Sequence, residues 1–150
     1  MGDKKTMAGL VLFAGQNLVE NLSFIPADKW NWKPAPEAKS AQEIVNHVLE
    51  NFAMFNGYFG GTGFEPVNDI DSAKAGLHQA TRDYAANLHS ATPEQLDEIL
   101  DLGSMKLPLS QLASMAVIDL LNHHGQITYI QSLLGDSESH FDMSAFAHVS

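Results

Sequence analysis

The 150-residue sequence contains no cysteine, so disulfide scaffolds, thiolate zinc sites, CxxC redox motifs and cysteine nucleophiles are excluded. Basic residues are also scarce. Lys and Arg number 8 against 18 Asp and Glu, for a formal net charge of -10 at pH 7. Nucleic acids and anionic membrane surfaces attract clustered Lys and Arg, and here the basic residues are scattered. Neither is therefore an expected partner.

Long hydrophobic runs are lacking too, because no stretch reaches the roughly 20 apolar residues that a membrane span needs. Two lysines followed by an apolar run from Met7 to Gly15 have the outline of a short signal peptide. Apolar residues continue at helical spacing well beyond any cleavage point, at Val11, Ala14, Leu18, Leu22 and Ile25. We interpret the segment as an amphipathic first helix, with Asn17, Glu20 and Asn21 on its opposite face. A cytoplasmic protein is expected.

Length and composition favour one globular domain over residues 1–150, since 45% of the residues are hydrophobic and 17% are charged. The apolar periodicity predicts four long helices, at about 4–22, 40–58, 69–89 and 110–134. Capping boxes begin at Ser40 and Thr92, and Gly135 is a natural helix terminator. A loop with three prolines occupies 23–39, and 98–109 is predicted to be an extended or irregular crossover.

These elements predict an all-α fold, a four-helix bundle with at least one long connection. The tail, residues 136–150, lacks strong periodicity. We expect it to be partly ordered or to hold a short helix around 144–148.

Polar residues stand where the predicted helices should face the core. In the last helix the core stripe is Leu112, Ala116, Asp119, His123, Gln126, Ile130 and Leu133. Asp119 and His123 are four residues apart and therefore share one face. In the second helix, His47 lies in the stripe Ile44, His47, Val48, Phe52 and Phe55.

Burying a bare carboxylate costs several kcal/mol, so Asp119 needs a partner. Two explanations are open at this point. Asp119 and a histidine form a buried hydrogen-bonded pair that fixes helix register, or His47, Asp119 and His123 converge on a divalent metal ion.

A resemblance extends this interpretation. The pattern Trp32-x-Pro34, Ser40-x-x-Glu43-x-x-x-His47 and Asp119-x-x-x-His123-x-Gly125-Gln126 resembles the DinB-like superfamily of damage-inducible four-helix proteins. The match covers nearly the whole chain, from the first helix to Gly135. Members of this superfamily resemble bacillithiol- and mycothiol-dependent S-transferases.

The resemblance implies His47, Asp119 and His123 as ligands of zinc or nickel, with manganese or iron as further candidates. Many members have a histidine where this chain has Asp119, and an acid there favours harder ions. His124 stands where an arginine is common, and we consider it only as a candidate catalytic base. Gln126, one turn beyond His123, is expected to hydrogen-bond a ligand or to orient an imidazole.

Two functions are compatible with these residues. One is a metal-dependent S-transferase or hydrolase, in which the ion activates water or a low-molecular-weight thiol of a small-molecule substrate. The other is a non-catalytic, stress-associated or ligand-binding helical module with a structural polar or metal site. A homodimer is expected in either case. Aromatic residues of the second helix suit either its interface or the core (Phe52, Phe55, Tyr58 and Phe59).

Overall fold

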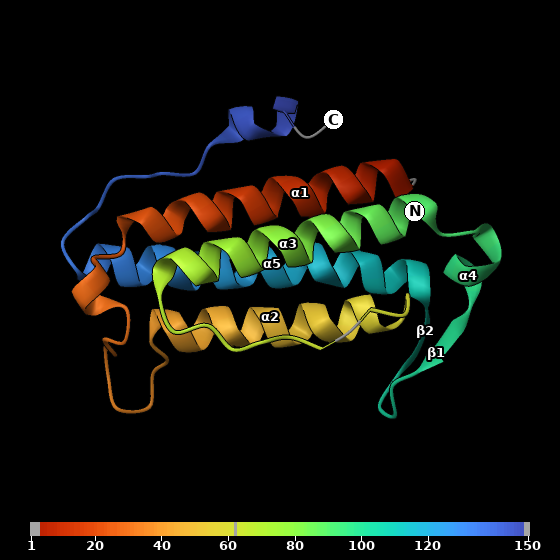
Figure 1. Cartoon of the computed structure of the whole chain (residues 1–150), viewed down its shortest axis with the longest axis horizontal. Helices are drawn as coiled ribbons and strands as arrows, with labels where there is room; N and C mark the ends of the chain where they lie inside the picture. Colours follow the sequence, from red (N-terminus) through yellow and green to blue (C-terminus); the bar gives the residue numbers. More distant parts are fainter. Residues whose placement is uncertain (1–3, 62, 149–150) are drawn as a thin grey trace.

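The computed structural model describes residues 4–61 and 63–148, although not the side chains of 146–148. Four long helices form the bundle in Figure 1: α1 (Lys4–Asn21), α2 (Ala41–Gly57), α3 (Ile70–Ser90) and α5 (Leu109–Leu133). Their bounds lie within one or two residues of those predicted from the sequence. The expected all-α bundle is confirmed. None of the helices in the described ranges is long and apolar enough to cross a membrane.

The helix starts follow the capping signals in the sequence. The Ser40 side chain accepts a hydrogen bond from the Glu43 amide at the start of α2, and Asp69 does the same for Ser72 at the start of α3. The Glu43 side chain does not complete a capping box, because it pairs with Lys33 at 3.0 Å. Short 3-10 turns, Leu22–Phe24 (η1) and Ala27–Lys29 (η2), lie in the proline-rich loop before α2.

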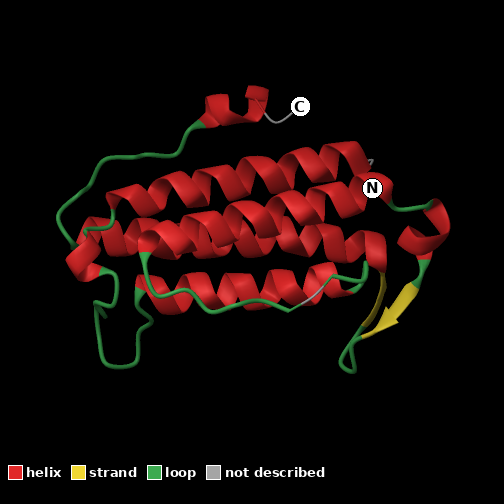
Figure 2. Cartoon of the chain, viewed as in Figure 1, coloured by secondary structure: helices red, strands yellow, loops and turns green. Residues whose placement is uncertain are grey.

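The predicted crossover between α3 and α5 is more regular than expected. A short helix α4 (Pro93–Asp97) begins with a complete capping box and leads into a hairpin of β1 (Ile99–Asp101) and β2 (Lys106–Pro108). The two strands pair antiparallel, with Leu100 opposite Leu107. Figure 2 shows this hairpin at one end of the bundle, well separated from the loop that leads into α2.

Helices that follow each other in sequence are not always neighbours in space. α1 packs mainly against α3 and α5, and α2 packs against the same two helices from the other side (Figure 1). The contact between α1 and α3 is close at Gly15, where an added Cβ would lie 2.8 Å from the Thr81 Cγ2 atom. A side chain at this position would push the two helices apart.

The tail is attached to α1 by two buried asparagines. Asn17 accepts a hydrogen bond from the Asp142 amide and donates to the Asp142 carbonyl, at 2.7 and 3.2 Å. Asn21 donates to the His140 carbonyl at 3.2 Å. Both asparagines are only 1% exposed, so their predicted place on the outer polar face is wrong. The tail covers that face and continues into a 3-10 segment, Met143–His148 (η3).

Tyr84 in α3 is fully buried, and its hydroxyl has no hydrogen-bond partner. Burial raises the pKa of this hydroxyl, which therefore stays neutral. Because an unpaired buried hydroxyl is costly, Tyr84→Phe is expected to raise the free energy of unfolding by about 1 kcal/mol, measured by urea denaturation. Tyr129→Phe is the control, since Tyr129 is 65% exposed and should show no change. A stability loss in Tyr84→Phe would contradict the assignment.

Candidate metal-binding cluster

The predicted site residues come together between α2 and α5. These two helices run in opposite directions (Figure 1). The ring centroids of His47 in α2 and His123 in α5 are 5.1 Å apart. Asp119 lies one turn before His123, and its Oδ1 atom is 3.3 Å from the His123 Nδ1 atom. The structure therefore places all three predicted ligands in one cluster.

His123 has a fixed ring orientation. Its Nδ1 atom is 2.7 Å from the Asp119 backbone carbonyl oxygen, which can only accept a hydrogen bond. The Nδ1 atom therefore carries the proton, and in the neutral ring Nε2 keeps a free lone pair. The hydrogen bond to the Asp119 side chain raises the pKa of His123, whereas burial and the charge of Lys39 act in the opposite direction. A metal-binding histidine usually donates its other ring N–H to a carbonyl or a carboxylate, as His123 does here.

Asp119 is the only Asp, Glu, Lys or Arg in α5, and its side chain is 15% exposed. One carboxylate oxygen, Oδ1, accepts a hydrogen bond from the Asn51 side chain at 2.9 Å. The other oxygen, Oδ2, is buried and has no hydrogen-bond partner. Buried carboxylate oxygens are normally satisfied, so this oxygen is an open acceptor inside the cluster.

Asn51 is the site residue that the sequence analysis missed. It lies one turn after His47 on α2, and its Nδ2 atom is 3.4 Å from the His47 Nε2 atom. The same Nδ2 atom donates to Asp119, so a partly positive N–H group stands between an imidazole nitrogen and a carboxylate oxygen. The spacing His-x-x-x-Asn on a core-facing stripe was the available signal.

The types of side chain in this cluster suit a divalent metal ion, but their positions in the structure do not form a metal site. Two imidazoles and a carboxylate are the three protein ligands of many catalytic zinc sites. Across residues 4–61 and 63–148, however, no three His, Asp or Glu side chains are arranged to hold a metal ion. The Asn51 amide group occupies part of the space between the donors. Metal binding at this cluster therefore requires Asn51 to move.

Two of the three comparisons with known proteins find the same protein. No family model matches the sequence. The uncharacterized protein YjoA of Bacillus subtilis (strain 168) is 28% identical over 125 residues, which cover 78% of this chain and 81% of YjoA. The crystal structure of YjoA, described as a DinB-like protein, superposes with a TM-score of 0.74 at 23% identity, covering 91% of this chain and 98% of that one. This chain has the DinB-like fold.

Two further predicted residues lie apart from the cluster in this DinB-like bundle. His124 is buried, but its ring lies 5.4 Å from Phe141 of the tail, and burial lowers its pKa. Gln126 is exposed. Neighbouring helix positions differ by about 100° in direction, so His124 turns away from the face shared by Asp119 and His123. Neither the base role of His124 nor the orienting role of Gln126 is supported by this placement.

The structure decides between core and dimer surface for the aromatic residues of α2. Phe52 and Phe55 are 0% and 4% exposed and belong to the core of the DinB-like bundle, where both pack against Tyr84. Tyr58 and Phe59 are partly buried against the same core. A homodimer remains a prediction, but these side chains are not a free surface.

Proposed function

We propose that His47, Asp119 and His123 bind a divalent metal ion and that the protein is a metal-dependent enzyme acting on a small molecule. The observation that carries the proposal is the buried, unpartnered Oδ2 atom of Asp119, a residue that contacts His123, whose ring in turn packs against that of His47. A cation is the partner that would satisfy this oxygen and the free Nε2 lone pair of His123 together.

The ligand set determines the chemistry that an ion would supply. Two neutral histidines and one carboxylate leave a formal charge of one positive on a divalent ion, together with an open coordination position. Such an ion lowers the pKa of a coordinated thiol or water. Because the chain has no cysteine, the thiol must come from a small molecule, which favours an S-transferase or a hydrolase. Zinc and nickel suit imidazole ligands, and the carboxylate also accommodates manganese or iron.

A second candidate function is a non-catalytic helical module, and Asn51 is the observation that favours it. The hydrogen bond from Asn51 to Asp119 already joins α2 to α5 without a metal, and the Asp119–His123 pair within α5 holds the carboxylate in place. In this alternative the polar groups fix the register of the two helices. If the cluster is purely polar, this alternative predicts no response to added metal; if it holds a structural metal, only an assay of catalysis separates the two functions.

The test of the proposal is metal binding by untagged protein. We expect about one zinc, nickel or manganese ion per chain by elemental analysis, together with a thermal midpoint that rises with zinc and falls with chelator. His47→Ala and His123→Ala should both lose the ion. His78→Ala is the matched control, because His78 is exposed on α3 and should leave binding unchanged. The proposal would be contradicted if the protein contained no metal and its thermal midpoint changed with neither zinc nor chelator.

Asn51→Ala separates metal binding from a purely structural cluster. Removing the amide leaves Asp119 without its donor from α2, so the metal-free variant should lose about 1–3 kcal/mol of stability. Under the metal proposal, zinc restores this loss and binds at least as tightly as in the original chain, because the competing N–H group is gone. Under the structural alternative, zinc restores nothing. Consumption of small thiols with an electrophile, measured with and without chelator, then tests catalysis itself.

The predicted homodimer has a different candidate surface, the outer face of α5. Met115, Ile118, Leu121 and Tyr129 are exposed there, and the face carries no charged residue. Because each copy has a net charge of -10, two copies approach with least repulsion through an uncharged face. We therefore propose a second copy of this chain as its partner.

Sedimentation should test the dimer directly. Ile118→Glu is expected to convert a dimer to a monomer, since it places two like charges in the interface. Met143→Glu is the control, because Met143 is also exposed but lies in the tail. A chain that is already monomeric at high protein concentration would contradict the prediction.

A further inference from the structure

A groove with unusual charge lies between the first half of α1 and the second half of α3. Its volume is about 700 Å³, within the usual range for small-molecule sites. Small apolar residues line its inner part, with Ala8 and Ala85 buried and Gly9 and Leu12 partly buried. Because these side chains are short, the two helices leave space between them instead of filling it.

The rim of this groove is basic. Lys5, Arg82 and His89 all line it and are exposed, and no Asp or Glu is among the lining residues. Within the described ranges, none of the three makes a hydrogen bond or an ion pair. In a chain with 8 Lys and Arg against 18 Asp and Glu, unpaired basic residues around an apolar surface are unexpected.

The side chain of Lys4 has a structural role in the fold, whereas that of Lys5 has none. Lys4 donates a hydrogen bond to the Ala91 carbonyl at 2.9 Å and so satisfies the end of α3. Lys5 has no such contact, and a lysine in the first turn of α1 opposes the helix dipole. A bound anion would remove this unfavourable interaction.

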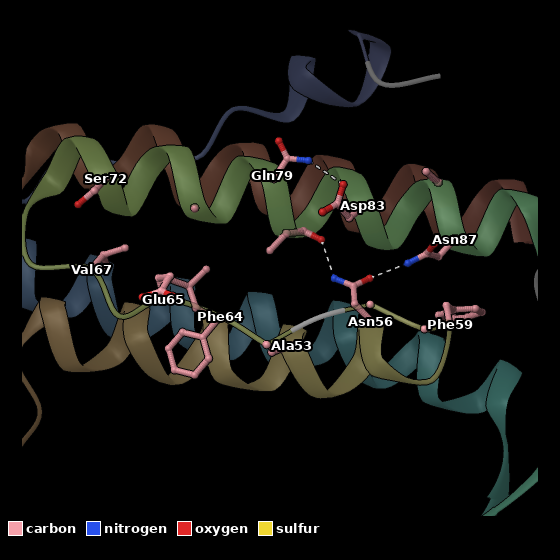
Figure 3. A pocket seen from close by; sticks show the side chains of 17 residues that line it. Ala53, Asn56, Phe59, Phe64, Glu65, Val67, Ser72, Gln79, Asp83 and Asn87 are labelled. Atoms are coloured by element: carbon pink, nitrogen blue, oxygen red, sulfur yellow. Dashed lines mark hydrogen bonds between the residues drawn. The ribbon is translucent and has the colours of Figure 1, made fainter.

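The cleft on the other side of α3 has the opposite charge. It is about 720 Å³ and is lined by Glu65 and Asp83, with no basic residue (Figure 3). Asn56, at its inner side, already donates to the Ala80 carbonyl and accepts from Asn87. The acidic groups of this cleft would repel an anion, whereas the basic rim of the α1–α3 groove would attract one.

We propose that the α1–α3 groove binds a single-chain fatty carboxylate. The alkyl chain would lie over the small apolar residues, and the carboxylate would contact Arg82 and Lys5. Arginine pairs with carboxylates through two parallel hydrogen bonds, which suits a head group at the rim. The apolar inner surface favours an alkyl carboxylate over a small inorganic anion, which would leave that surface uncovered.

Calorimetric titration with hexanoate, octanoate and decanoate tests the chain and the head group separately. Affinity should rise by about fourfold for each added methylene while the chain remains in the groove. Decylamine should bind much more weakly than decanoate, because its charge has the wrong sign. An affinity independent of chain length, or equal binding of decylamine, would overturn the proposal.

Variants then locate the site. Arg82→Gln and Lys5→Gln should each weaken decanoate binding by about fivefold, as expected for exposed ion pairs. Asp83→Asn is the matched control. Asp83 follows Arg82 in the sequence but lines the opposite cleft, so this substitution should not reduce the affinity for decanoate. Unchanged binding in both Arg82→Gln and Lys5→Gln would overturn the assignment.

Gly9→Leu tests occupancy of the inner groove without disturbing the fold. No atom lies within 4 Å of a Cβ added at Gly9, and leucine is a better helix former than glycine. This variant should therefore fold at least as well but lose more affinity for decanoate than for hexanoate. Binding to phosphatidylglycerol vesicles without binding to free decanoate would show a lipid surface as the partner and contradict the proposal.

Discussion

Phe52→Ala is expected to lower the free energy of unfolding by about 3–5 kcal/mol. Phe52 in α2 is 0% exposed and packs against Tyr84 of α3. Its ring packs edge to face with Phe55 at 5.4 Å and with Tyr84 at 5.6 Å. Alanine removes a large buried apolar ring together with its contacts to Phe55 and Tyr84. The cavity that remains cannot close unless a helix moves.

Urea denaturation followed by tryptophan fluorescence measures this loss, because Trp30 and Trp32 lie just before α2. The control is Met54→Ala on the same helix. Met54 is 48% exposed, so the change in unfolding free energy should stay within about 0.5 kcal/mol. A loss below 1 kcal/mol for Phe52→Ala would show that the α2–α3 contact is not packed as described.

Asn17→Ala is expected to cost about 2–3 kcal/mol and to release the tail from α1. The Asn17 side chain makes three hydrogen bonds, two with the Asp142 backbone and one with the Phe13 carbonyl. Alanine removes all three and leaves the Asp142 amide and carbonyl without these partners. The buried surface of α1 beneath the tail then becomes accessible to water.

Hydrogen exchange gives the most direct readout for this variant. The Asp142 amide should exchange much faster in Asn17→Ala, while amides in the middle of α3 stay protected. Gln16→Ala is the control, because Gln16 makes only an exposed contact with Glu20 at 3.2 Å. Unchanged protection at Asp142 would show that Asn17 does not hold the tail.

The helices were predictable because their signals are local. Ser40, Thr92 and Gly135 mark ends through capping and turn conformations that depend only on neighbouring residues, and Gly135 indeed has a φ of 106° after α5. The apolar stripe from Val11 to Ile25 was correct for the same reason, since helical periodicity alone selects the buried face.

The errors come from contacts between distant segments. Asn17 and Asn21 resemble surface residues because nothing near them in sequence indicates that residues 136–145 return to cover α1. His47, Asp119 and His123 were noticed because each interrupts an apolar stripe, and the structure places His123 near both other residues, while their role as metal ligands stays a prediction. Asn51 was missed because a single amide on a half-buried position looks ordinary until Asp119 is placed opposite it.

The arrangement of α1 against α3 and α5 has a consequence for how the chain folds. α1 has little contact with α2, the next long helix in the sequence, so these two helices cannot dock as a local hairpin. Contacts between residues far apart in sequence slow folding, because a long loop must close before they form. The apolar side of α1 should therefore remain exposed until α3 and α5 have been synthesised. Nascent chains stopped before α5 should bind chaperones, whereas chains stopped after the tail should not.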